Sequence, residues 1–183
     1  WNLNFKDKTT DSRENIIQSL ENNLSLVTKE HLNSDVPIGI FLSGGIDSTA
    51  LAYLASKNKK SLYSFSVTFD EKEWAEGNYA EETAHELGIK HTELVLSPSD
   101  LNKSITSAMD SLDQPSIDGT NVYIISKLVR AKGIKVALSG QGGDEIFGGY
   151  RSFRDIPRAV KIDKFLRLLP SSIRKIMSVI WSL

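Results

Sequence analysis

A short loop of small residues and one acid carries the clearest chemical signal in this chain. Its residues are Ser43, Gly44, Gly45, Ile46, Asp47 and Ser48. The glycines allow a tight bend and the close approach of a ligand, and the segment that follows is a good helix former. Backbone N–H groups and the positive end of the helix dipole would therefore converge on one point, which predicts an anion-binding site.

The charged residues of this loop indicate which anion it would bind. A Walker A loop needs a lysine before its serine or threonine to hold phosphates, and this loop has none. It has Asp47 instead, which would repel a phosphate unless a cation lay between them. Mg²⁺ typically takes one or two carboxylates together with phosphate oxygens. The loop therefore predicts a site for phosphate and Mg²⁺, and an ordinary strand-to-helix turn is the alternative.

A second segment repeats this arrangement near residue 140. The short, mostly apolar run 134–138 is followed by Ser139, Gly140, Gln141, Gly142, Gly143, Asp144 and Glu145. In an open parallel sheet, ligands bind outside the carboxyl ends of the strands, so Asp47 and Asp144 could face one metal ion. The alternative is a plain turn in which Asp144 caps the next helix.

The elements that position these two loops alternate between helix and strand. Strands are predicted at residues 38–42, 61–69, 90–96 and 134–138, and helices at residues 13–32, 48–55, 78–87, 123–131 and from residue 98 onward. This order is typical of an α/β fold with an open, mostly parallel twisted sheet and helices on both faces.

The two motifs together resemble those of a known enzyme family. The first resembles the pyrophosphate loop of the ATP pyrophosphatase (PP-loop) superfamily, whose fold is adenine nucleotide alpha hydrolase-like. The longer run 138–150 is similar to the second signature of its asparagine synthetase branch. The similarity extends from about residue 11 to 150 and includes residues 34–37 and 113–115. It implies an ATP- and Mg²⁺-dependent ligase that adenylates the aspartate side chain and transfers ammonia to give asparagine, AMP and pyrophosphate.

The resemblance also implies roles for single residues. The positions that would contact ATP are Leu42, Ser43, Gly44, Gly45, Asp47, Ser48, Val67, Ser139 and Gly140, and those that would hold Mg²⁺ are Asp47 and Asp144. Gln141 stands where the family usually has a catalytic glutamate, and an amide cannot take a proton as a carboxylate can. Two alternatives follow: an amidotransferase that acts on another carboxylate, or a non-catalytic nucleotide-binding module.

A polar loop between two predicted helices is a candidate for binding the substrate. Residues 116–121 open onto a helix start, which suits a substrate carboxylate, with Asp118 and Thr120 as the candidate contacts. Simple helix capping by either residue is the alternative. The three histidines, His31, His85 and His91, are too scattered for a zinc site and are expected at the surface or at helix ends.

Composition limits the remaining possibilities. The 183 residues, 40% of them hydrophobic, suffice for one globular core. A net charge of −1 gives no reason to expect nucleic acid or a membrane as a partner, and the absence of cysteine excludes disulfides. No apolar stretch is long enough to span a membrane, so a cytoplasmic enzyme acting on small molecules is expected.

The two ends of the chain suggest that it is one piece of a larger enzyme. Residues 1–183 are expected to be a single, truncated synthetase domain. Residues 1–10 resemble the junction after a glutaminase domain, which in this family supplies ammonia from glutamine, and the full-length protein could be a homodimer. Residues 151–183 form a basic, amphipathic segment that is predicted to be a helical tail.

Overall fold

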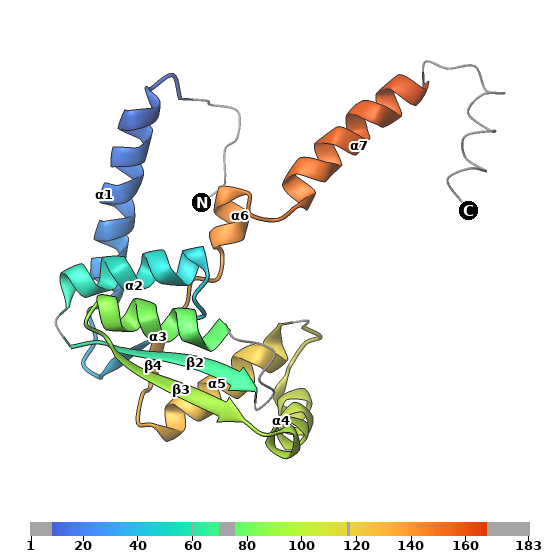
Figure 1. The fold of residues 1–183 in the computed structure, drawn as a ribbon. Coiled ribbons are helices and arrows are strands. Elements are labelled where there is room, and N and C mark those ends of the chain that lie inside the picture. Colours follow the sequence, from blue (N-terminus) through green and yellow to red (C-terminus); the bar gives the residue numbers. More distant parts are fainter. Residues whose placement is uncertain (1–8, 60, 70–75, 117, 168–183) are drawn as a thin grey trace. The chain divides into compact units, whose positions relative to one another are not determined.

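The structure is a computed structural model that describes residues 9–59, 61–69, 76–116 and 118–167 (Figure 1). The chain divides into two compact units, Trp1–Gly140 and Gln141–Leu183. The division falls inside the second of the two motifs, between its second and third residues.

The first unit is built around a four-stranded sheet. Its strands are β1 (Ile38–Phe41), β2 (Tyr63–Phe69), β3 (Lys90–Leu96) and β4 (Val136–Leu138). They lie in the order β3-β2-β1-β4, and every neighbouring pair is parallel. The predicted α/β fold with a parallel sheet is therefore confirmed. The predicted strand at 90–96 has the observed bounds, whereas β2 and β4 each begin two residues later than predicted.

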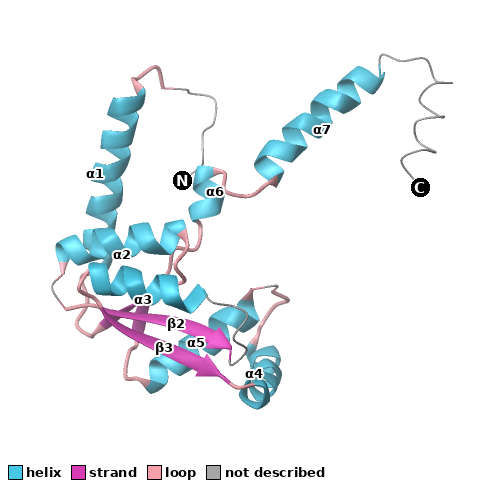
Figure 2. Cartoon of the chain, viewed as in Figure 1, coloured by secondary structure: helices cyan, strands magenta, loops and turns pink. Residues whose placement is uncertain are grey.

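Helices cover both faces of this sheet (Figure 2). The helices of the first unit are α1 (Arg13–His31), α2 (Ile46–Asn58), α3 (Glu76–Glu86), α4 (Pro98–Ser111) and α5 (Gly119–Ala131). Alternate residues of β1 and β2 point to opposite faces, and each face has its own apolar core. The core toward α2 and α3 contains Ile38, Ile40, Leu42, Ala52, Ala55, Ala80 and Ala84. The core toward α5 contains Phe65, Leu94, Val129 and Ile134.

Helix α1 shows the limit of reading burial from periodicity. It begins where the sequence predicts, because the Ser12 hydroxyl accepts the N–H of Asn15 at 3.2 Å and caps the first turn. Its apolar residues recur at helical spacing, yet Ile17 is 52% exposed and Val27 is 47% exposed. Helical spacing identifies residues that share a face, but the packing partners decide whether that face is buried.

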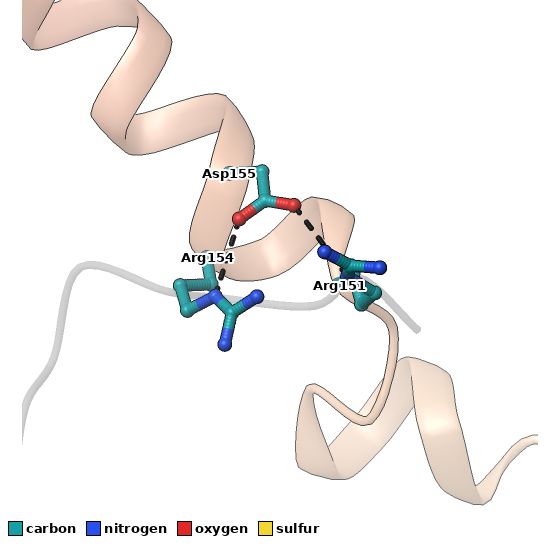
Figure 3. A network of polar contacts seen from close by, with 3 residues as sticks. All are labelled: Arg151, Arg154 and Asp155. Carbon is teal, nitrogen blue, oxygen red and sulfur yellow. Dashed lines mark hydrogen bonds and ion pairs between the residues drawn. The ribbon is translucent and has the colours of Figure 1, made fainter.

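The described part of the second unit, residues 141–167, contains two helices, α6 (Gly143–Phe147) and α7 (Ser152–Arg167). Helix α7 is the described part of the predicted helical tail, and residues 168–183 lie outside the described residues. Near its start, Asp155 contacts Arg154 at 3.1 Å and Arg151 at 3.9 Å (Figure 3). These side chains are at least half exposed, so the ion pairs add little stability. Neither α7 nor any other described helix has the length and apolar character that crossing a membrane requires.

Candidate functional site

The first motif forms the connection between β1 and α2, as the sequence predicts. Strand β1 ends at Phe41, and α2 begins at Ile46 with Gly45 in the N-cap position. The first N–H groups of an α-helix have no acceptor inside the helix, so they are available to an anion at this end. The loop thus lies at the carboxyl end of a central strand, where open parallel sheets bind ligands.

Hydroxyl groups inside the loop hold its shape. The buried Ser48 hydroxyl accepts the Ser43 N–H at 3.2 Å and donates to the Gly45 carbonyl at 3.1 Å. The Ser43 hydroxyl lies 3.1 Å from the Ser48 hydroxyl and accepts a longer bond from the Gly45 N–H at 3.4 Å. The Ser48 hydroxyl therefore links the start of α2 to the first residues of the loop. The contact of Ser43 and Ser48 with pyrophosphate stays a prediction.

Gly44 is required by both conformation and space. Its φ angle is +79°, in the region that favours glycine. A Cβ atom at this position would lie 2.8 Å from the Tyr79 Cβ and 3.4 Å from the Ala80 nitrogen. The loop consequently rests directly against the backbone of α3.

Gly140, from the second motif, lies against the start of α2. A Cβ atom added at Gly140 would be 2.9 Å from the Ser48 nitrogen and 3.0 Å from the Asp47 carbonyl carbon. Strand β4 pairs with β1 in parallel, which brings the ends of both strands to one edge of the sheet. The predicted closeness of the two motifs is therefore observed as far as Gly140.

Asp47 is the acid of the first motif and lies in the first turn of α2. It is half-buried, and within the described residues its carboxylate has no hydrogen-bond or ion-pair partner. A half-buried carboxylate without a partner suits a cation ligand, because oxygen atoms are the ligands that Mg²⁺ prefers. No group of three or more His, Cys, Asp or Glu side chains suited to a metal ion occurs among the described residues. Other ligands of such an ion would then have to include phosphate or water oxygens.

Leu42 and Val67 are the predicted contacts for the nucleoside. Val67 lies in β2, and Leu42 directly follows the last residue of the neighbouring strand β1. The Leu42 side chain is buried in the core, and its N–H donates to the Phe65 carbonyl at 2.9 Å. Val67 is half-buried and packs against the core on the α5 side. Leu42 can therefore offer a ligand only its backbone carbonyl, and nucleotide contact by either residue stays a prediction.

The remaining part of the second motif folds as a compact turn in the second unit. Gly142 is the N-cap of α6, so Asp144 lies inside the first turn of that helix and does not cap it. A Cβ atom at Gly149 would collide with the Asp144 carboxylate, and the Tyr150 hydroxyl donates to the Glu145 carboxylate at 2.8 Å. Gln141 and Ser139 are both exposed. The predicted roles of Asp144, Gln141 and Ser139 stay predictions.

The polar loop proposed for substrate binding leads into α5. Asp118 occupies the N-cap position, but its side chain makes no capping hydrogen bond to the helix and its Oδ1 accepts from Asn121 Nδ2 at 3.2 Å. The Ser116 hydroxyl accepts the Gly119 N–H at 2.9 Å. Helix α5 consequently begins at Gly119 and includes Thr120, whereas the sequence predicted a start at residue 123. Substrate contact by Asp118 and Thr120 stays a prediction.

The sequence did not predict one polar cluster, which lies between the first halves of β2 and β3. His31 and His85 lie in the last turns of α1 and α3, as expected, but His91 lies in β3 and is only partly exposed. Its ring bonds to Ser64 and Ser66 of β2. The alternation of serines with Tyr63 and Phe65 was visible in the sequence, but the partner strand was not.

Comparison with known proteins gives a consistent family. Residues 19–178 match the family described as "Asparagine synthase". The chain is 35% identical over 179 residues to "Asparagine synthetase [glutamine-hydrolyzing] 1" of Bacillus subtilis, with 97% of this chain and 27% of that protein covered. It is 32% identical over 192 residues to "Asparagine synthetase B [glutamine-hydrolyzing]" of Escherichia coli, with 95% and 32% covered. The chain thus spans about a quarter to a third of the length of these curated relatives.

A solved structure shares the fold. The NH3-dependent NAD synthetase from Campylobacter jejuni, in complex with the nitrate ion, has a TM-score of 0.50 and 17% sequence identity. The alignment covers 73% of this chain and 60% of that chain. At this identity the likeness concerns the fold, a parallel sheet with helices on both faces.

Proposed function

This chain belongs to the asparagine synthase family, and we propose that it is the ATP-using part of an amide-forming ligase. The observation that carries the proposal is the loop at the carboxyl end of β1, where Gly44 approaches α3 and Gly140 approaches the start of α2. This arrangement concentrates backbone N–H groups at one edge of the sheet, which suits a chain of phosphates. Residues 19–178 match the family, so the similarity includes both motifs.

The proposed reaction begins with a substrate carboxylate that attacks the α-phosphate of ATP. The bond between the α- and β-phosphates breaks, pyrophosphate leaves, and an acyl adenylate forms. Ammonia then attacks the acyl carbon and displaces AMP, which leaves the amide. In this scheme Ser43, Gly44, Gly45 and Ser48 hold pyrophosphate, and Ser139 and Gly140 contact the nucleotide from the neighbouring strand end. Donors fixed before the reaction stabilise the charge that develops on the leaving pyrophosphate.

Asp47 and Asp144 are the proposed ligands of Mg²⁺. Their carboxylates belong to the class of donor that this ion prefers, and the half-buried Asp47 has no other partner among the described residues. When bound, the ion would neutralise charge on the phosphates. Without it, Asp47 would repel the same phosphates, so the loop alone would bind free ATP poorly.

Aspartate is the proposed acceptor, with asparagine as the product. The names of the curated relatives support this choice, since both are asparagine synthetases. Gln141 favours the second candidate, an amidotransferase for a different carboxylate, because it replaces a group that could take a proton with one that cannot. A non-catalytic nucleotide-binding module is the third possibility.

Three further properties belong to the whole protein and stay proposals. We propose that ammonia comes from glutamine through a domain outside this chain, as the names of the glutamine-hydrolysing relatives suggest. A homodimer and a cytoplasmic location are likewise predictions. Neither nucleic acid nor a membrane is proposed as a partner.

The test of the function is acid-dependent exchange of labelled pyrophosphate into ATP by the full-length protein. Exchange that requires aspartate supports the synthesis of asparagine, whereas exchange with other carboxylic acids supports the second candidate. Measurable ATP binding without exchange for any acid would favour the binding module. Absence of both ATP binding and exchange would overturn the proposal.

A further inference from the structure

A histidine and two serines form a polar cluster between β2 and β3. The Ser64 hydroxyl lies 2.9 Å from His91 Nδ1, and the Ser66 hydroxyl lies 3.0 Å from His91 Nε2. Both ring nitrogens are thus occupied by hydroxyl groups of one neighbouring strand. Two bonds from a planar ring fix its position and also fix the two serines relative to β3.

The cluster lies on the face of the sheet that α3 covers. Ser64 and Ser66 alternate with Phe65, which points into the core on the α5 side, so the serines point to the opposite face. Ser64 is fully buried and Ser66 is 6% exposed. Ala80 and Ala84 of α3 are fully buried on this face, and such small side chains let the helix approach the strands closely. A polar cluster in such a layer is stable only if its hydrogen bonds are made.

Ser66 connects this cluster to the edge that would bind the nucleotide. The preceding residue, Phe65, accepts the Leu42 N–H through its carbonyl at 2.9 Å, directly before the phosphate loop begins. The following residue, Val67, is the predicted nucleoside contact. A displacement of Ser66 would therefore be transmitted both to the start of the loop and to Val67.

We propose that His91 is a positioning residue that fixes the middle of β2, level with the carboxyl end of β1, for nucleotide binding, and that it does so best as a neutral imidazole. The proposal rests on the proposed function, since it assigns a role in ATP binding. His91 itself touches no substrate in this scheme. It acts through Ser66.

The preference for the neutral ring follows from the hydrogen bonds. A neutral imidazole has one N–H donor and one acceptor nitrogen, so one serine accepts from the ring and the other donates to it. A protonated ring has two donors, so both serine oxygens must accept. The hydroxyl hydrogen that had pointed at the ring must then turn to another acceptor inside a buried layer. Protonation therefore disturbs the position of one serine.

The surroundings agree with a neutral ring. Burial lowers the pKa of the His91 imidazole below its ordinary value, and this effect exceeds the opposing attraction of Glu81 on α3 and Glu93 on β3. The side chains of β2 that bond to the ring are Ser64 and Ser66, and neither carries a charge. The cluster thus changes state at acidic pH.

The test measures MgATP affinity by titration calorimetry between pH 7.5 and 5.0 in the intact protein. The variants are His91→Gln and Ser66→Ala, and the matched control is His85→Gln, an exposed histidine at the end of α3. At pH 7.5, losing one of these hydrogen bonds should weaken MgATP binding about fivefold. Ser66→Ala leaves His91 bound to Ser64 and keeps the test valid if His91→Gln does not fold.

The pH profile separates positioning from a general loss of structure. The phosphates of ATP also take up protons between pH 7.5 and 5.0, but this change affects the wild type and all variants equally. The affinity loss from pH 7.5 to 5.0 should be about threefold larger in the wild type and in His85→Gln than in His91→Gln. In ¹⁵N-labelled wild-type protein without nucleotide, the Val67 amide signal should shift with a midpoint below pH 6.5, and this shift should be absent in His91→Gln.

The outcomes distinguish this inference from the function on which it rests. Equal MgATP affinities and equal pH profiles for the two histidine variants would overturn the positioning role while leaving the ATP site intact. A wild type that binds no MgATP at pH 7.5 overturns the proposed function, and the role of His91 in ATP binding with it. A Val67 amide that does not respond to pH also overturns the proposal.

Discussion

At the residue scale, Asp47 and Ser48 have different tasks although they are adjacent in α2. Successive residues on a helix do not face the same direction, so one can point into the loop while the other points elsewhere. The Ser48 hydroxyl is buried and bonded to Ser43 and Gly45. The Asp47 carboxylate is half-buried and has no partner among the described residues. We infer that the Ser48 hydroxyl holds the shape of the loop, whereas the Asp47 carboxylate is available to bind a ligand.

Replacing Asp47 with asparagine should remove Mg²⁺-dependent use of ATP. The variant keeps the shape of the side chain but loses the charge that would hold the ion, and we expect turnover to fall by at least about a hundredfold. The carboxylate makes no described hydrogen bond or ion pair, so thermal unfolding without ligand should change only slightly, through the lost attraction between Asp47 and the positive end of α2. The control is Asp110→Asn, an exposed acid on α4. Unimpaired turnover in Asp47→Asn would refute the assignment.

The sequence predicted the loop residues but not the cluster around His91. Ser43 to Ser48 are contiguous, so their types, their order and the apolar run before them are enough to identify the loop. The partners of His91 lie 25 and 27 residues away and meet it only through the register of β2 and β3. Register is set by the packing of both strands, and a single strand pattern does not contain it.

At the element scale, the end of β4 and the start of α2 are packed together at Gly140. The atoms nearest to an added Cβ are Ser48 N and the Asp47 carbonyl carbon, both in the backbone of a helix. Backbone atoms of a packed helix cannot move aside as the end of a flexible side chain can. The close approach of these two elements therefore depends on the lack of a side chain at position 140.

Gly140→Ala should destabilise the first unit and weaken ATP binding. Overpacking of this kind typically costs about 1–3 kcal/mol, and the shift of β4 away from α2 would also separate the two motifs. The measurement is urea unfolding without nucleotide, followed by MgATP titration. Gly45→Ala is a comparison for the unfolding measurement alone, since Gly45 belongs to the proposed pyrophosphate loop. Its added Cβ would meet the Ser43 hydroxyl at 3.4 Å and no backbone atom, so its loss of stability should be smaller than that of Gly140→Ala and should reflect mainly the poorer N-cap. Equal stability of Gly140→Ala and the wild type would contradict the packing argument.

The observed helix starts agree with the predicted ones where a neighbouring side chain in the sequence caps the helix. Ser12 begins α1 and Ser97 begins α4 by accepting backbone N–H groups, and both residue types are typical N-caps. Helix α5 begins earlier than its apolar pattern predicts, because the Ser116 hydroxyl accepts the Gly119 N–H. That contact depends on how the loop before the helix folds, which periodicity does not describe.

At the scale of the whole molecule, the sheet separates two different layers. The layer toward α5 is an apolar core around Phe65 and Leu94. The layer toward α3 combines buried alanines with Ser64, Ser66 and the partly buried His91. Serines and aromatic residues alternate along β2 and so lie on opposite faces, but the polar face gains its hydrogen bonds only because His91 lies opposite Ser64. Part of the stability of the first unit therefore depends on a titratable group.

The free energy of unfolding should accordingly fall in acid through His91. Burial lowers the pKa of this imidazole in the folded state below the ordinary value of 6.5, so the unfolded chain takes up a proton more readily. The contribution is complete above about pH 6.5 and is lost as the pH falls below that value toward the lower folded pKa. Urea unfolding at pH 7.5, 6.5 and 5.5 measures it. His91→Gln should lose less stability over this range than the wild type, whereas His85→Gln should follow the wild type. Parallel curves for the wild type and His91→Gln would show that the ring is not desolvated, because only a group whose pKa differs between the two states makes stability depend on pH.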